Sequence, residues 1–171
     1  MLIVYIFTSV IIIAIIYLLV RPIIKGAAYF PTKRANIETI IKFIEPKVGD
    51  RVADLGSGDG RIVTALAKSG AKAYGYEINP LLVWYSRREI KLENLQKKAF
   101  IYWKSYWKEN LNKYSTVVVY GYPRIMKKLG EKLKTELAPG TKVISNIYAF
   151  PNLKEVESEN GVRLYIIPDK H

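Results

Sequence analysis

The sequence predicts an α/β fold in which a doubly wound, mostly parallel sheet carries helices on both faces and ends in an antiparallel hairpin. Three observations predict it. Short apolar, β-type runs alternate with helical patterns between residues 36 and 147. A glycine-rich turn joins the first of these runs to the helix after it. Near the C-terminus, Asn160-Gly161 separates two further β-type segments, which is a strong hairpin signal.

The expected elements follow from where the apolar periodicity changes. Strands are expected at residues 51–55, 72–77, 99–103, 116–120 and 142–147, with the hairpin strands in 154–159 and 163–168. Helices are expected from Asn36 until Pro46, at residues 61–70, from Asn79 to about Leu95, and over about 124–137. Asn79-Pro80 supports a helix start, because Asn is a favoured N-cap and Pro fits the first helical position. The almost wholly apolar run at 116–120 is typical of a central, buried parallel strand.

The N-terminal residues 2–20 form an uncharged apolar run, with only Thr8 and Ser9 as polar members. A helix of this length covers roughly 28 Å, close to the hydrocarbon core of a bilayer. A cleaved signal would begin with basic residues and end in a small-residue motif, neither of which is present. A buried core helix is disfavoured because the run is apolar on every face. We therefore expect a transmembrane anchor at residues 1–21, a juxtamembrane linker at 22–35 and one folded domain at 36–171.

The charge distribution bears on orientation and partners. Arg21, Lys25, Lys33 and Arg34 follow the apolar run and no Lys or Arg precedes it, so the positive-inside rule predicts a single-pass membrane protein whose folded domain is cytoplasmic. The whole chain has 27 basic and 15 acidic residues, a net charge of +12. For an anchored domain this excess favours contact with anionic lipid headgroups over binding to nucleic acid, although both remain open.

The composition also excludes some chemistry. Cysteine is absent and the single histidine is His171. The sequence therefore predicts no disulfide, no thiolate nucleophile and no metal site built from cysteine or histidine.

The segment VADLGSGDGRI, residues 52–62, carries the most functional information. A strand, a tight glycine turn and a helix form the usual arrangement for a nucleotide-like ligand, but Gly56-x-Gly58-x-Gly60 alone is a weak signal. The flanking charges are more informative. Asp54 and Asp59 would repel the pyrophosphate of a dinucleotide, whereas they would attract the sulfonium and ammonium groups of S-adenosyl-L-methionine.

Glu77 follows at the end of the second expected strand, where an acidic side chain can accept hydrogen bonds from ribose hydroxyls. Alternatively, Asp54 could only cap the loop and Glu77 could only be a solvated strand end. The two carboxylates together favour the methyl donor over a dinucleotide. The terminal hairpin points the same way, because class I methyltransferases add such a hairpin to the plain dinucleotide-binding fold.

The combination of DLGSGDGRI (54–62) with GYEINP (75–80) resembles a family of small class I, Rossmann-like protein-lysine methyltransferases. This family includes the mitochondrial enzymes that modify the ATP synthase c-subunit and the adenine nucleotide translocase, together with archaeal and bacterial relatives. Supporting segments are Tyr29-Phe30-Pro31-Thr32 and residues 104–108 and 132–145.

The resemblance implies a set of cofactor contacts. Asp54, Gly56 and Gly58 would shape the methionine end of the site, Glu77 would hold the ribose, and Asn79 would cap the helix beneath it. Ser105 stands where family members commonly have Asp, at the position expected to meet the adenine amino group. Serine can accept that hydrogen bond, but more weakly. The full set of expected cofactor-binding residues is Asp54, Gly56, Ser57, Gly58, Asp59, Glu77, Asn79, Ser105 and Tyr106.

The acceptor is expected near the end of the fourth strand, at Tyr120-Gly121-Tyr122-Pro123. Tyr120 or Tyr122 is the candidate catalytic residue and would orient the acceptor amine, although both tyrosines could merely pack. The loop lacks the [DNS]-P-P-[YF] pattern of enzymes that methylate exocyclic amines of bases. The aromatic, basic stretch 103–108 could stack bases, but it is expected to be part core strand and part interface.

These observations predict an S-adenosyl-L-methionine-dependent methyltransferase. The resemblance implies that it is a protein-lysine N-methyltransferase, and the expected anchor suggests a membrane or membrane-associated protein as its substrate. The alternatives are a methyltransferase for a small molecule or lipid, and a basic RNA-binding protein with a vestigial methyltransferase fold. Label from a radioactive methyl donor would enter protein, lipid or neither in the three cases.

Overall fold

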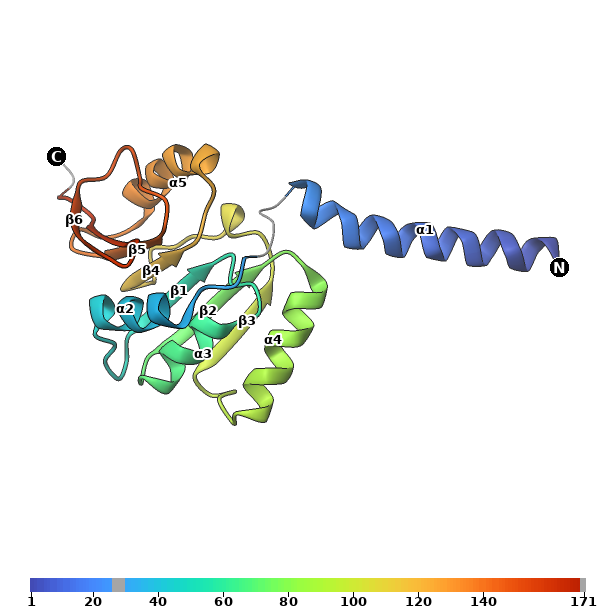
Figure 1. Ribbon diagram of the computed structural model, residues 1–171, viewed down its shortest axis with the longest axis horizontal. Coiled ribbons are helices and arrows are strands. Elements are labelled where there is room, and N and C mark those ends of the chain that lie inside the picture. The colour runs from blue at the N-terminus through green and yellow to red at the C-terminus, as the bar shows by residue number, and fades with distance from the viewer. Residues whose placement is uncertain (26–29, 170–171) are drawn as a thin grey trace.

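Seven strands form one mixed sheet in the order β3-β2-β1-β4-β5-β7-β6 (Figure 1). The computed structural model describes residues 1–25 and 30–169, with side chains for residues 1, 3–17 and 30–169. The strands are β1 (Arg51–Leu55), β2 (Lys72–Glu77), β3 (Ala99–Trp103), β4 (Thr116–Val119), β5 (Lys142–Asn146), β6 (Glu155–Glu159) and β7 (Val162–Ile166). The first five strands are parallel, and β7 runs antiparallel to both β5 and β6.

Helices cover both faces of this sheet (Figure 1). On one face lie α2 (Arg34–Ile44), α3 (Arg61–Lys68) and α4 (Pro80–Leu92). On the other lie α5 (Pro123–Glu136) and the short 3₁₀ helix η1 (Tyr106–Lys108). The two apolar clusters between sheet and helices form the core. Strand β4 supplies both of them, since Val118 points into one cluster while Val117 and Val119 point into the other.

The predicted doubly wound, mostly parallel sheet with a terminal antiparallel hairpin is confirmed. Asn160 and Gly161 form the hairpin turn with φ values of +52° and +77°, as the two positive-φ positions of such a turn require. Left-handed residues also lie at the ends of other elements. Gly70, with φ +108°, lies just beyond the end of α3, and Ile147, with φ +74°, ends β5 one residue before the expected limit.

The expected transmembrane helix is wrong. Residues Leu2–Lys25 do form a helix, α1, but within the described part of the chain no helix is both long and apolar enough to cross a membrane. The prediction of a single-pass membrane protein with a cytoplasmic domain depended on that helix and is therefore not supported.

The expected linker at residues 22–35 is only partly described. α1 continues into it as far as Lys25, and α2 begins at Arg34, two residues before the expected start of the domain. Residues 26–29 lie outside the described residues, and they include Tyr29 of the segment used for the family resemblance.

A buried amide pair joins α2 to the end of β5. Asn36 donates from Nδ2 to Oδ1 of Asn146 over 2.7 Å, and Asn146 donates in turn to the hydroxyl of Thr32 over 3.3 Å. All three side chains are buried. Buried polar groups are costly unless they are hydrogen-bonded, so this network fixes α2 and the segment before it against the end of β5.

Replacing Asn36 by Ala should lower the free energy of unfolding by about 1–3 kcal/mol, because the carbonyl oxygen of Asn146 loses its donor while it stays buried. Urea-induced unfolding measures this loss. Asn112→Ala is the matched control, since Asn112 is exposed, and a change within about 0.5 kcal/mol is expected for it. Equal losses in the two variants would contradict a structural role for the amide pair.

Candidate cofactor and acceptor site

The expected site residues gather at one edge of the sheet because the parallel strands end in register. Leu55 at the end of β1 pairs with Tyr76 on β2 and with Val119 on β4, and Glu77 pairs with Trp103 on β3. The residues that follow these strands therefore share the carboxyl edge. In open α/β sheets ligands bind at this edge, where the strand order reverses, which here is between β1 and β4.

The glycine loop after β1 is held against β2. Gly56 and Ser57 both donate their amides to the carbonyl of Tyr76, over 2.9 and 3.0 Å. Gly75 makes this approach possible, since a Cβ there would lie 2.5 Å from the Ser57 hydroxyl oxygen. Gly58 adopts φ +54°, a left-handed conformation that glycine takes at little cost.

Glu77 organises the start of the next helix and the loop together. Its side chain is 8% exposed, and one carboxylate oxygen accepts the amide of Gly58 over 3.0 Å. The other oxygen accepts the amides of Ile78 and Asn79, each over 2.7 Å. Asn79 then caps α4 by accepting the amide of Leu81. A carboxylate has about four acceptor positions, so three amide bonds leave capacity for a further donor such as a hydroxyl.

Asp54 is buried among negative charge. The residue is 2% exposed, and its Oδ2 has no hydrogen-bond partner among the described residues. Burial, together with the negative charges of Glu77 and Asp59, raises the pKa of this carboxyl to about 8. A buried carboxyl without a partner normally pairs with a cation or stays protonated. This edge of the sheet thus fits a cationic ligand and does not fit a pyrophosphate.

Asp59 differs from Asp54 because its charge is balanced. Its carboxylate pairs with Arg61, with a shortest separation of 2.6 Å, and Arg61 also donates to the carbonyl oxygen of Thr32 over 2.9 Å. Arg61 was missed by the sequence reasoning, although it follows Asp59 closely within the glycine motif. Through these contacts it joins the glycine loop to the segment that precedes α2.

Ser105 and Tyr106 lie beside Glu77. The amide of Lys104 donates to the carbonyl of Glu77 over 3.1 Å, which ties this loop to the end of β2. Burial, with a smaller contribution from the negative charge of Glu77, raises the pKa of the Tyr106 hydroxyl to about 12. Ser105 precedes η1 and its hydroxyl does not cap that helix. The structure thus brings all nine expected cofactor residues to one edge.

Tyr120 and Tyr122 follow β4 on the other side of the glycine loop. Each ring lies beside the ring of Tyr148, with centroid separations of 6.5 Å for Tyr120 and 6.4 Å for Tyr122. Burial raises the pKa of Tyr120, and the two neighbouring tyrosines raise it further. The sequence reasoning missed Tyr148, since nothing in the residues around it indicates that it returns to the end of β4.

Comparison with known proteins identifies the family. Residues 54–157 match the ANTKMT methyltransferase domain. A Xenopus laevis relative, named as the lysine N-methyltransferase of the ATP synthase c-subunit, is 41% identical over 124 residues, which cover 72% of this chain and 54% of that protein. The chain belongs to the ANTKMT methyltransferase domain family. The resemblance drawn from the sequence motifs is therefore confirmed.

Two further comparisons bear on this methyltransferase domain. A protein-lysine N-methyltransferase from Saccharolobus islandicus is 30% identical over 149 residues, which cover 81% of this chain and 92% of that protein. A crystal structure of an RNA methyltransferase from Salinibacter ruber, in complex with S-adenosyl-L-homocysteine, matches with a TM-score of 0.75 and 27% identity. That match covers 83% of this chain and 96% of the other. The chain spans only about half the length of the Xenopus protein.

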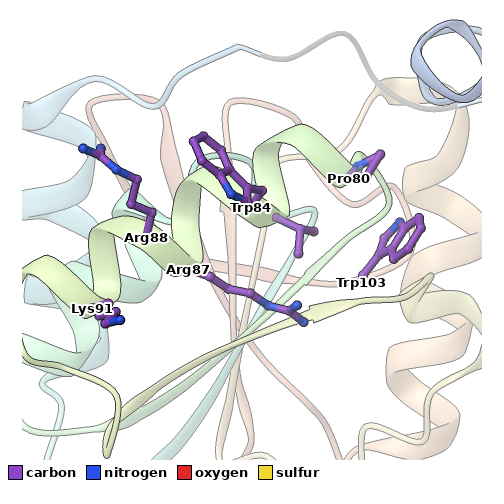
Figure 2. A pocket seen from close by; sticks show the side chains of 7 residues that line it. Pro80, Trp84, Arg87, Arg88, Lys91 and Trp103 are labelled. Atoms are coloured by element: carbon purple, nitrogen blue, oxygen red, sulfur yellow. The ribbon is translucent and has the colours of Figure 1, made fainter. Parts of the chain in front are cut away.

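A separate groove lies on the outer side of α4 in this methyltransferase domain. Figure 2 shows its two exposed tryptophans, Trp84 and Trp103, with the side chain of Arg87 beneath them. Its volume is about 460 Å³, and it is lined by Pro80, Val83, Trp84, Arg87, Arg88, Lys91 and Trp103. Trp103 donates to the carbonyl of Ile78 over 3.0 Å, so the groove adjoins the Glu77 end of the cofactor edge. None of its lining residues was expected in the site.

The stretch 103–108 divides between core and surface. Trp107 packs against the apolar cluster beneath α5, whereas Trp103 is 57% exposed.

In the described residues, no group of three or more Asp, Glu, Cys or His side chains is placed to hold a metal ion.

The burial of Asp54 should make the stability of the domain fall as pH rises from about 4 to about 8. Over that interval the folded protein keeps a proton on Asp54 that the unfolded chain, with a pKa near 4, has already lost. Asp54→Asn removes this contribution, so its melting temperature should rise relative to the wild type as pH increases. Each kcal/mol relieved corresponds to roughly 2–4 °C in a domain of this size.

Thermal unfolding at several pH values measures the difference between the two proteins. Glu131→Gln removes an exposed carboxylate on α5 and is the control; its difference from the wild type should not change with pH. If the melting temperatures of Asp54→Asn and of the wild type changed with pH in parallel, the buried carboxyl of Asp54 would not be the cause of the loss of stability at higher pH.

Proposed function

We propose that this chain is an S-adenosyl-L-methionine-dependent protein-lysine N-methyltransferase. The observation that carries the proposal is the unpartnered, buried carboxyl of Asp54 directly before the glycine loop. A site with excess negative charge suits a ligand that brings a sulfonium and an ammonium group. Family membership and the S-adenosyl-L-homocysteine held by the Salinibacter neighbour support the same cofactor.

The residues at the carboxyl edge would divide the cofactor among them. Asp54 would face the cationic methionine end, with the amides of the glycine loop around it. Glu77 would accept the ribose hydroxyls with its remaining capacity, while Ser105 and Tyr106 would lie near the adenine. Asp59, being paired with Arg61, would act by holding the loop and not as a free charge.

Methyl transfer to an amine requires the protein mainly to place the donor and the acceptor in line. When bound, S-adenosyl-L-methionine supplies a methyl group on a cationic sulfonium, which passes to an amine lone pair as the C–S electrons return to sulfur. Tyr120 and Tyr122 lie across the glycine loop from Glu77, where an incoming amine would arrive, and their hydroxyls can accept an N–H bond and so orient the lone pair. Proximity and alignment of this kind can supply a large part of the rate enhancement in such transfers.

A lysine side chain is the acceptor that the relatives support best. The Saccharolobus protein, of which this chain covers 92%, is named a protein-lysine N-methyltransferase. The Xenopus relative is named for the ATP synthase c-subunit, and we propose only that this chain likewise modifies a lysine in a protein. The bilayer contact expected for residues 2–20 depended on the transmembrane helix and is not carried forward.

RNA is the second candidate acceptor, because the Salinibacter neighbour is titled an RNA methyltransferase and the chain carries a net charge of +12. The loop Tyr120-Gly121-Tyr122-Pro123 counts against it, since it lacks the sequence pattern of enzymes that methylate base amines.

Radiolabelled S-adenosyl-L-methionine should transfer label to protein when the purified chain is incubated separately with the protein, RNA and lipid fractions of its own organism. Mass spectrometry of the labelled protein should then show methyl groups on lysine. Glu77→Ala, which removes the expected ribose acceptor, should abolish the signal and serves as the blank. Label confined to RNA or to lipid would overturn the proposal.

Tyr120→Phe or Tyr122→Phe should lower the turnover number on a lysine peptide by roughly 2- to 10-fold, the cost of one neutral hydrogen bond of about 0.5–1.5 kcal/mol. Tyr85→Phe, on the exposed side of α4, should leave the rate unchanged. If both variants kept the wild-type rate, neither tyrosine hydroxyl would orient the amine.

A further inference from the structure

We propose that Tyr148 joins Tyr120 and Tyr122 in an aromatic binding site that recognises the acceptor as an alkylammonium group through the faces of the three rings. This inference rests on the proposed function and names how that function selects its substrate. It adds a residue, Tyr148, that neither the motifs nor the family match assigns to the site.

The ring geometry is the first support. Tyr148 lies beside both other rings, with tilts of 34° to Tyr120 and 32° to Tyr122, and all three side chains are partly buried. Centroid separations of 6.4–6.5 Å are at the wide end of the range of about 4.5–7 Å for aromatic pairs. A cation is attracted to a ring when it lies within about 6 Å of the centroid. An ammonium that approaches Tyr148 can therefore be in range of two rings at once.

The backbone before Tyr148 is the second support. Ile147 has φ +74°, a left-handed conformation that is unfavourable for a β-branched residue. The conformation is held from both sides, because the Ile147 amide donates to the carbonyl of Gly161 over 2.8 Å and its carbonyl accepts from Arg163 over 3.2 Å. The chain thus leaves β5 by a strained turn, and the residue that the turn positions is Tyr148.

A hydroxyl then secures the carbonyl of Tyr148 itself. Ser145, which is fully buried on β5, donates from its Oγ to the carbonyl oxygen of Tyr148. Strained backbone persists where the surroundings over-determine it, and such places cluster at binding and catalytic sites.

The position in the sheet is the third support. Tyr120 follows Val119, which pairs with Leu55 on β1 and with Ser145 on β5. The three rings therefore lie across one strand end from the glycine loop and from the buried carboxyl of Asp54. An amine held by the rings would face the methyl end of the cofactor.

The faces of the three rings attract a cation, because an aromatic π-system is negative on its face. Burial, followed by the neighbouring tyrosines, raises the pKa of Tyr120, so the attraction comes from the ring face and not from a phenolate charge. Because attraction to a ring face needs no N–H group, a methylated ammonium is held as well, and this provides a stable probe.

The test compares two short glycine-flanked peptides, one with a central trimethyl-lysine and one with its neutral isostere, in which carbon replaces the quaternary nitrogen. NMR titration of the full chain in the presence of S-adenosyl-L-homocysteine gives both affinities. The wild type should prefer the cation by roughly 5- to 30-fold, as expected for a desolvated ring contact. Tyr148→Phe keeps the ring and should keep the preference, whereas Tyr148→Leu should lose most of it.

Tyr85→Leu, at an exposed position on α4, is the matched control and should behave as the wild type. Tyr148→Leu should also raise KM for a lysine peptide with little change in kcat or in the affinity for S-adenosyl-L-methionine. Retention of cofactor binding shows that this variant is folded. Equal affinity of the wild type for the two peptides, or an undiminished preference in Tyr148→Leu, would overturn the proposal.

The proposed function can fail separately, because a wild type that prefers the cationic peptide without methylating lysine would leave the ring site standing. A wild type that methylates lysine but binds both peptides equally would overturn the ring site and leave the proposed function standing.

Discussion

The amides of Gly56 and Ser57 both bind the carbonyl of Tyr76, and the rest of the site depends on this contact. It holds the turn after β1 against the end of β2, so that the amide of Gly58 reaches the carboxylate of Glu77. Gly75 is part of the same constraint, because a side chain there would meet Ser57 and push the loop away from the strand. One close approach of two backbones thus positions the two carboxyl groups, Asp54 and Glu77, on which the proposed cofactor binding relies.

The proposed cofactor side and the proposed acceptor side of this edge would each attract a cation, but through different groups. On the cofactor side, Asp54 is buried with excess negative charge around it, which disfavours the ionised carboxyl until a cation arrives. On the proposed acceptor side, the rings of Tyr120, Tyr122 and Tyr148 would attract a cation without a formal charge of their own. A carboxylate beside the acceptor would stabilise the ammonium and oppose loss of its proton, whereas ring faces bind the side chain more weakly and leave the nitrogen free to deprotonate.

Much of the fold could be predicted because its signals are local. The run TVVV was expected to be a central strand, and its alternate side chains do fill both core layers. Asn160-Gly161 specified the hairpin because its two residues supply the positive φ values that such a turn needs. The N-terminal segment shows the limit of this reasoning. Hydropathy predicted a transmembrane helix there, whereas within the described residues no helix is long and apolar enough to span a bilayer.

The sequence by itself determined the chemistry of the cofactor edge, since Asp54, the glycine turn and Glu77 lie close together along the chain and at fixed strand ends. The tertiary structure decided how those groups behave. Burial gave the two aspartates different environments: an oxygen of Asp54 has no partner among the described residues, whereas Asp59 pairs with Arg61. The tertiary structure also brought Tyr148 beside Tyr120, because the strands that precede them are neighbours in the sheet. Residues close together in the sequence indicate secondary-structure propensity and local charge. Burial and contacts between distant segments arise only when the strands pair in register in the folded sheet.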